Sequence, residues 1–146
     1  MTAMPMPMEY RQASVDFDRF MEELKEVSML RTSHQAYTML QAVFQVFRRR
    51  LTVQQAISFA NALPPVLRAI FVSDWDTNEE KREFGTEAEM MAEVRALRHN
   101  HNLSTDSAIR DVGEALRRSL DPEVFGRALA KLPAEAGEFW QLPVLS

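Results

Sequence analysis

Arginine is the residue type whose placement in this sequence most directly suggests a binding function. No Asp or Glu lies between Val27 and Ser73, yet this stretch carries five arginines. Guanidinium groups donate paired hydrogen bonds to phosphate and carboxylate groups, and phosphate contacts of this kind dominate nucleic-acid binding. The arginines that could contact an anionic partner in this way are Arg48, Arg49, Arg50 and Arg68.

The same arginines also have a purely structural explanation. Arg48 to Arg50 fall in the last turn of an expected helix, where cations offset the helix dipole by about 0.3–1 kcal/mol. Arg117 and Arg118 recur at the corresponding place later in the chain. Residues 1–72 carry eight basic and six acidic groups, whereas residues 73–146 carry nine basic and fifteen acidic groups. Pairing of the arginines with the acidic second half is therefore the explanation that we favour over anion binding.

Two further groups of residues could in principle hold a cation. His99 and His101 are the only closely spaced histidines, but a zinc site needs more ligands and no His-Glu-x-x-His spacing occurs. The acidic stretch from Asp74 to Glu83 lacks the glycine and the ligand periodicity of a calcium loop. We therefore expect no metal site, and we interpret the acidic stretch as a solvated connector whose Trp75 folds onto the core.

Composition excludes several classes of function. The absence of cysteine removes thiolate catalysis and zinc–thiolate sites, and neither a Gly-x-Ser-x-Gly sequence nor a glycine-rich phosphate loop is present. We therefore predict that the chain is not an enzyme and binds no cofactor. A net charge of -4 argues against nucleic acid as a partner. The sequence has no apolar run near the roughly 18 residues of a membrane helix and no secretory signal, so we expect a cytoplasmic protein.

An internal repeat indicates which elements position these residues. At a constant offset of 69 residues, Leu51 aligns with Leu120, Leu63-Pro64 with Leu132-Pro133, and Ile70-Phe71 with Phe139-Trp140. Only six of the 36 positions from Ala36 to Phe71 are identical, which leaves chance alignment as the alternative. The helix-start signals and the Leu-Pro stops coincide as well, so we favour a true duplication.

Apolar residues at three- and four-residue spacing predict that every element is a helix. In the first repeat we expect helices over about 16–30, 33–50, 53–62 and 66–72, with Ser33 as the N-cap of the second and Thr52 with Gln55 as a capping box. In the second repeat we expect Thr86 with Glu89 as a capping box, a helix to about His99, a helix capped by Ser104, a helix starting at Asp121-Pro122, and a closing turn from Glu135 to Trp140.

These signature residues resemble domain-of-unknown-function family 2267, an uncharacterised bacterial family. The matching residues are Phe17, Phe20 and Val27 of the first helix, Leu63-Pro64 with Leu67, Ile70 and Phe71, and Leu132-Pro133 with Phe139 and Trp140. The resemblance covers roughly residues 16–140. It implies an all-α duplicated domain and implies no activity.

The sequence thus predicts an all-α, tandem-duplicated helical bundle with two units of three helices plus a short closing helix. Residues 1–14 are expected to be a flexible tail, and residues 15–146 a single domain of two repeats (about 16–72 and 84–140) joined by the connector 73–83. Leu63 and Leu132 should be buried, and Phe44 should pack near Gly113 where the second and fifth helices meet. We predict a non-enzymatic interaction or regulatory module that binds an unknown protein partner or forms a homodimer. The alternative is an anion- or nucleic-acid-binding module that uses the arginine-rich first repeat.

Overall fold

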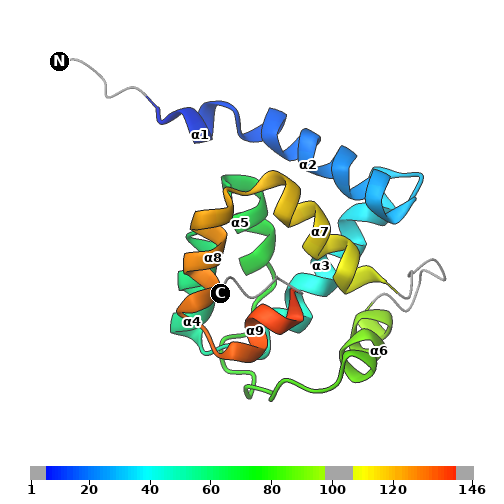
Figure 1. Cartoon of the computed structure of the whole chain (residues 1–146), viewed down its shortest axis with the longest axis vertical. Helices are drawn as coiled ribbons and strands as arrows, with labels where there is room; N and C mark the ends of the chain where they lie inside the picture. Colours follow the sequence, from blue (N-terminus) through cyan, green and yellow to red (C-terminus); the bar gives the residue numbers. More distant parts are fainter. Residues whose placement is uncertain (1–5, 98–106, 141–146) are drawn as a thin grey trace.

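The predicted all-α class is confirmed by the computed structural model, which describes residues 6–97 and 107–140. Within these two ranges, every regular element is an α-helix (Figure 1). The helices are α1 (Met8–Arg11), α2 (Ala13–Ser28), α3 (Ser33–Arg48), α4 (Val53–Ala60), α5 (Pro65–Val72), α6 (Glu87–Leu97), α7 (Ala108–Ser119), α8 (Pro122–Ala130) and α9 (Ala134–Phe139).

Local capping chemistry sets several of the helix starts. The side chain of Thr52 accepts a hydrogen bond from the Gln55 amide, and the Gln55 side chain accepts one from the Thr52 amide, so the predicted capping box at α4 is confirmed. Asp121 accepts from the Glu123 amide at the start of α8, which also agrees with the sequence prediction. These side chains satisfy amide groups that have no partner within the helix itself.

Two helix starts differ from the prediction, and a third cannot be compared with it. Thr32, not Ser33, caps α3, because only Thr32 has a glutamine three residues later with which to form a reciprocal capping box. Helix α2 begins at Ala13 rather than Asp16, and the single turn α1 precedes it within the segment expected to be a tail. The predicted cap Ser104 lies outside the described residues, and α7 is described from Ala108 onward.

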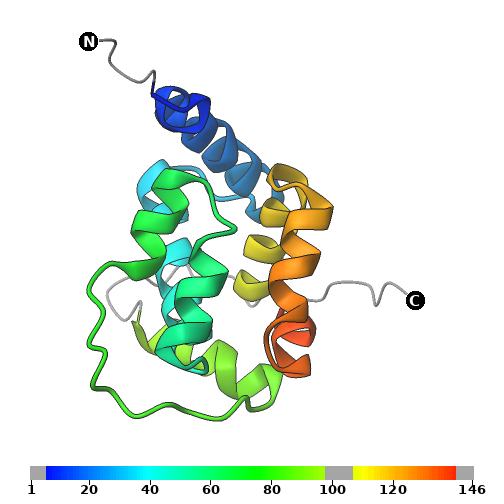
Figure 2. The ribbon, with the colours of Figure 1, turned by 90° about the vertical axis from the view of Figure 1, so that its left-hand side faces the viewer.

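Helix α3 occupies the middle of the structure. It packs against α2, α5, α6 and α7, and nine of its sixteen residues are buried (Figures 1 and 2). Its buried residues are therefore covered by helices of the same chain. Each contact removes apolar surface from water, which stabilises the fold by about 25 cal/mol per Å².

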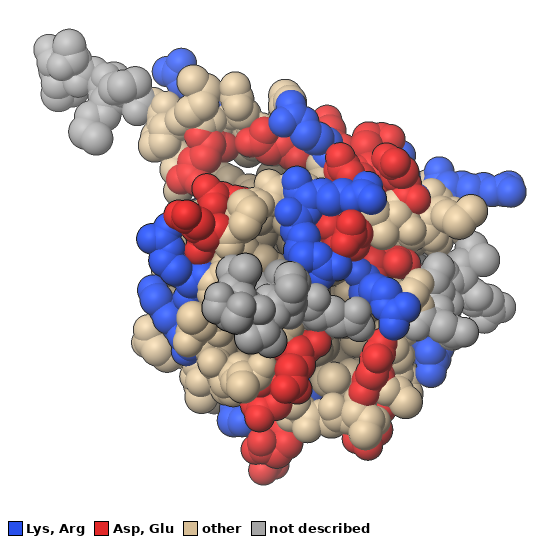
Figure 3. Space-filling view, viewed as in Figure 1, with Lys and Arg blue, Asp and Glu red and all other residues tan. Residues whose placement is uncertain are grey.

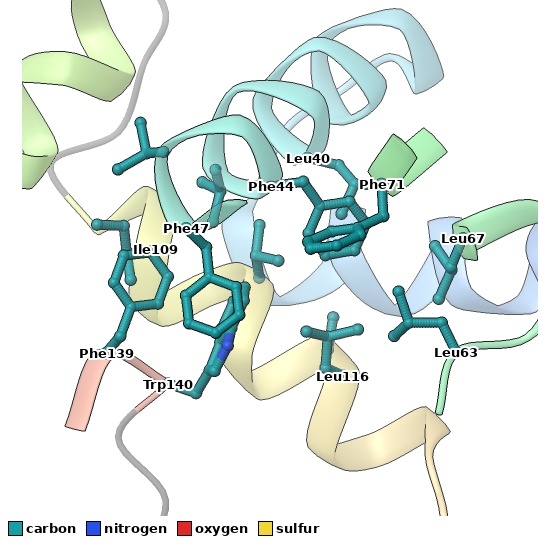
Figure 4. Packing of buried hydrophobic residues seen from close by; sticks show 14 of the residues in the cluster. Leu40, Phe44, Phe47, Leu63, Leu67, Phe71, Ile109, Leu116, Phe139 and Trp140 are labelled. Carbon is teal, nitrogen blue, oxygen red and sulfur yellow. The ribbon is translucent and has the colours of Figure 1, made fainter. Parts of the chain in front are cut away.

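The two halves of the chain share this core. Helix α2 lies along α7, α3 lies against α6 and α7, and α4 contacts α8. The aromatic rings follow the same pattern: the ring centroid of Phe47 on α3 lies 4.9 Å from those of both Phe59 and Trp140. Figure 4 shows Phe47 beside Trp140. Leu63 and Leu132 are 2% and 8% exposed, so the predicted burial of both Leu-Pro leucines is confirmed.

The expected contact of Gly113 with Phe44 is replaced by a contact with Trp140. Helices α3 and α7 do pack together, but a Cβ atom on Gly113 would lie 3.2 Å from the carbonyl oxygen of Trp140. Phe44 instead contacts the Trp140 ring, with 6.4 Å between centroids. Trp140 has this position because α9 carries the end of the chain back onto the α3–α7 pair, which the local helix pattern does not reveal.

Candidate functional site

Arg48, the first of the predicted anion contacts, is buried and is bonded to the backbone at the end of α5. Its Nη1 atom donates to the carbonyl oxygens of Phe71 at 2.8 Å and Ser73 at 2.9 Å, and Nη2 donates to Asp74 at 3.4 Å. The guanidinium also lies over the ring of Trp75, 5.2 Å from its centroid, so Trp75 packs onto the core as expected. Burial lowers the pKa of Arg48, although an arginine so held stays charged.

Arg49 and Arg50 converge on one carboxylate, that of Glu93 on α6. Arg50 forms a two-point ion pair with Glu93 and also donates to the Val46 carbonyl at 2.9 Å. Arg49 lies 3.4 Å from Glu93, and Arg82 of the connector lies 2.9 Å from it. A guanidinium paired in this way is not free to bind an external phosphate.

Glu93 was not singled out from the sequence, although it is the centre of this network. Burial alone would raise its pKa, but the hydrogen bond from Arg50 and the charges of Arg50, Arg82 and Arg49 together lower it below the usual value. A detectable signal did exist: Glu93 lies beside the apolar stripe of α6, between Met90 and Val94, where a carboxylate needs a partner.

Arg68 completes the predicted set and lies apart from the other three arginines. It donates to the backbone carbonyls of Leu63 at 2.9 Å and Ala60 at 3.3 Å, which ties α5 to the end of α4. Its Nη2 atom also lies 3.9 Å from the carboxylate of Glu9. The structure therefore does not gather Arg48, Arg49, Arg50 and Arg68 into one open anion site, in agreement with the structural explanation.

The remaining sequence candidates are the two histidines and the carboxylates of the connector. His99 and His101 lie outside the described residues. In the part of the chain that is described, no three His, Asp or Glu side chains could hold a metal ion together. Among the connector carboxylates, Glu79 pairs with Arg49 at 3.3 Å and Asp76 accepts from the Asn78 amide. A search of the described helices finds none with the length and hydropathy to span a membrane.

The repeat signature residues form the interior rather than a surface site. Leu63, Phe71, Leu132 and Trp140 are buried, while Pro64 and Pro133 stand at the N-cap positions of α5 and α9. The carbonyl oxygen of Trp140 accepts a hydrogen bond from Arg117 Nη1 at 2.6 Å, as the carbonyl oxygen of Phe71 accepts one from Arg48. Their role here is to close each helical unit.

A groove with a mixed apolar and charged lining opens on the surface between α2, α5 and the end of α7. We call it the α2 groove; it has a volume of about 250 Å³. Charges of both signs surround it, and Arg118 bridges across to Glu23 at 3.1 Å. Figure 3 shows the same mixture of positive and negative groups over α2 and α7. Its apolar lining consists of Ala13, Phe17, Phe20, Pro64, Val66 and Leu67.

The chain segment that leads into this groove carries exposed apolar side chains. We call residues 6–15 the N-terminal arm; it comprises α1 and the first residues of α2, and α1 projects beyond the other helices (Figures 1 and 2). Four large apolar side chains of the arm are exposed to between 45% and 64%, namely those of Met6, Met8, Tyr10 and Val15. No other stretch of the described chain exposes as many within ten residues.

A second groove has a different chemistry. It lies between the start of α6 and α9, has a floor that includes Met90, Ile109 and Phe139, and carries exposed carboxylates on its rim. Figure 3 shows negative groups gathered over α9 and the start of α6. One rim carboxylate, Glu87, lies 3.7 Å from Arg110, and both side chains are more than half exposed, so this pair adds little stability.

Comparison with known proteins identifies the family of this chain. A family model described as "Uncharacterized conserved protein (DUF2267)" matches residues 17–139, and the resemblance seen in the sequence is thereby confirmed. No curated protein matches the chain. The matched range begins after the N-terminal arm and extends to the end of α9.

Proposed function

We propose that this chain, which belongs to the DUF2267 family of conserved proteins, acts as a non-enzymatic protein-interaction module. The observation that carries the proposal is the exposure of Met6, Met8, Tyr10 and Val15 on the projecting N-terminal arm. Burying these side chains against another protein would recover hydrophobic free energy that the isolated chain forgoes.

Scattered exposed apolar residues are ordinary on a protein surface, but a concentration of them is not. The arm concentrates four of them within ten residues, and its Ala13 also lines the α2 groove together with the apolar side chains of Phe17, Val66 and Leu67. Aromatic and methionine side chains are enriched where proteins bind one another, because they combine large contact area with adaptable packing. Tyr10, Met6 and Met8 supply both residue types.

The alternative of anion or nucleic-acid binding through the first repeat loses its support. Arg48 and Arg68 donate to backbone carbonyls, and Arg49 and Arg50 pair with Glu93. An anion would have to compete with these existing partners for the same guanidinium groups, at the cost of leaving buried carbonyls without donors. We therefore favour the interaction module over this alternative.

Site-specific photo-crosslinking in the source cells tests the proposal. A photoreactive amino acid replaces Tyr10 or Val15 in the arm, and in a matched control it replaces Val124, an apolar residue of α8 with 41% exposure. We expect irradiation to join a second polypeptide chain to the arm positions and not to the control. Absence of any protein adduct at Tyr10 and Val15, or an equal yield at Val124, would contradict the proposal.

A further inference from the structure

We propose that the partner of the N-terminal arm is a second copy of this chain, with the arm of each copy lying in the α2 groove of the other. This inference rests on the proposed function, because it names the partner of the same arm. This exchange would bury the exposed side chains of the arm against the apolar lining residues of the α2 groove. The same contact would form twice, once for each copy.

The position of the arm relative to the groove favours this occupant. Helix α2 belongs to both features: Val15 and the residues before it form the arm, whereas Phe17 and Phe20 line the groove. Two copies crossing antiparallel near Ala13 therefore place the arm of one directly over the groove of the other. In that crossing, Tyr10 and Met8 reach the level of Phe17 and Val66 of the second copy, and thioether–aromatic contacts of this kind are favourable.

The charges of the arm and the groove are complementary in the same crossing. The arm carries Glu9 and Arg11, and the groove rim carries Asp16, Arg19, Glu23 and Arg118. The antiparallel arrangement brings Arg11 of one copy near Asp16 of the other, twice by symmetry. Within one copy, Glu9 has a 3.9 Å contact with Arg68, and the Glu9 side chain is 51% exposed, so this pair adds little stability and is easily exchanged.

Symmetry favours the α2 groove over the second groove, between α6 and α9, as the site of self-association. The arm and the α2 groove share the start of α2, so in the proposed crossing a two-fold axis relates each contact to an identical one and the assembly closes as a dimer. Docking of another basic surface of the chain, such as Arg127 of α8 and Lys131 directly after it, into the second groove between α6 and α9 would be head-to-tail. Contacts of that kind lead to open chains or rings rather than to a closed pair.

Sedimentation velocity of the full chain over a range of concentrations tests the inference. We expect a monomer–dimer equilibrium for the unaltered chain. Tyr10→Ser in the arm and Val66→Asp in the groove should each raise the dimer dissociation constant by about tenfold or more. Val124→Asp, which introduces the same charge on an exposed valine of α8, should leave the dissociation constant unchanged. Thermal melting by circular dichroism identifies any variant that has lost its fold.

Mixing the two variants provides the sharper measurement. Neither homodimer retains an intact arm–groove contact, but a mixed pair retains one, between the arm of the Val66→Asp chain and the groove of the Tyr10→Ser chain. The mixture should therefore associate more strongly than either variant alone. A charge reversal, Arg11→Glu, should weaken the dimer, and adding Asp16→Arg to the same chain should restore it; these substitutions lie on the surface and leave the core in place.

Several outcomes would overturn the inference. They are a strictly monomeric unaltered chain, a dimer that Val66→Asp does not weaken, a dimer that Val124→Asp weakens equally, and a mixture without heterodimers. A monomeric chain whose arm nevertheless crosslinks to a different protein in cells would refute the second copy while leaving the proposed function intact. A chain that neither crosslinks to another protein nor self-associates would refute the dimer and the proposed function together.

Discussion

Arg48 donates a hydrogen bond from Nη1 to the main-chain carbonyl of Phe71 over 2.8 Å and so fastens the end of α3 to the last turn of α5. Phe71 is fully buried, so its carbonyl has no access to bulk water. Arg117 makes the corresponding bond to Trp140 at 2.6 Å. In both places the arginine and the aromatic residue are 23 positions apart, and the guanidinium serves the fold.

Replacing Arg48 should therefore destabilise the protein even though it removes a buried charge. Arg48→Met leaves the carbonyls of Phe71 and Ser73 without their donor, and we expect a loss of about 1–3 kcal/mol in the free energy of unfolding. Arg117→Met should cost less, because the Arg117 side chain is 26% exposed and water can reach its partner more easily. Urea denaturation measures both values; equal costs, or a stabilised Arg48→Met, would contradict this assignment.

Glu93 should make the stability of the fold sensitive to acid. The folded-state pKa of Glu93 lies below its usual value of 4.5, so its contribution is fully present above that pH and is lost as the pH falls through the depressed pKa. Glu93→Gln should cost about 1.5–3 kcal/mol at neutral pH, since Arg50 is left with a weaker partner. The difference between the two proteins should shrink on acidification.

Urea titrations over a series of pH values measure this effect. Glu80→Gln, an exposed carboxylate of the connector, serves as the control and should stay within about ±0.5 kcal/mol at every pH. A constant difference between the unaltered protein and Glu93→Gln down to low pH would count against the role assigned to Glu93.

Two glycines should respond oppositely to the same substitution. A Cβ on Gly126 of α8 meets no atom within 4 Å, so Gly126→Ala should stabilise the protein by up to about 1 kcal/mol through helix propensity. A Cβ on Gly113 would lie 3.2 Å from the Trp140 carbonyl, so Gly113→Ala should gain less or lose stability. Gly113→Leu should cost about 1–3 kcal/mol through overpacking. Thermal unfolding of the three variants measures these changes in stability. An equal gain in stability from alanine at both glycines would exclude a close contact at Gly113.

The two halves of the chain should not fold separately. A fragment ending at Thr77 would expose the surfaces of α2 and α3 that α6 and α7 cover, and the remaining fragment would expose the surfaces of α6 and α7 that pack on α2 and α3. We expect each fragment alone to lack a sharp thermal transition and to aggregate through the uncovered apolar surface. Calorimetry of the separate fragments checks this; two transitions as sharp as that of the intact chain would show independent units.

Local signals explain which features could be predicted from the sequence. The Thr52–Gln55 capping box and the Asp121-Pro122 start act over three or four residues, so the sequence alone specifies them. The choice between Thr32 and Ser33 was missed because two adjacent hydroxyls compete, and only the position of Gln35 decides between them. The helix turn at the arm was missed because the alternating Met and Pro residues favoured an irregular tail.

The features that the sequence did not predict depend on contacts between distant segments. The partners of Arg48 lie more than twenty residues away, and Glu93 is more than forty residues from Arg50. Sequence patterns showed that these arginines needed partners, but not which ones. The contact of Gly113 with Trp140 was likewise missed because it depends on the return of α9 onto α7, a tertiary arrangement that helix periodicity does not encode.

The two tryptophans give this protein a pair of built-in optical reporters. Trp140 is 1% exposed and stacks against Phe59, with ring centroids 6.1 Å apart, whereas Trp75 is partly exposed beside the Arg48 guanidinium. Indole emission depends on the polarity around the ring, so one residue monitors the aromatic interior and the other monitors the connector. Trp75→Phe and Trp140→Phe each leave a single emitter, and detachment of the connector can then be timed separately from opening of the core without any added label.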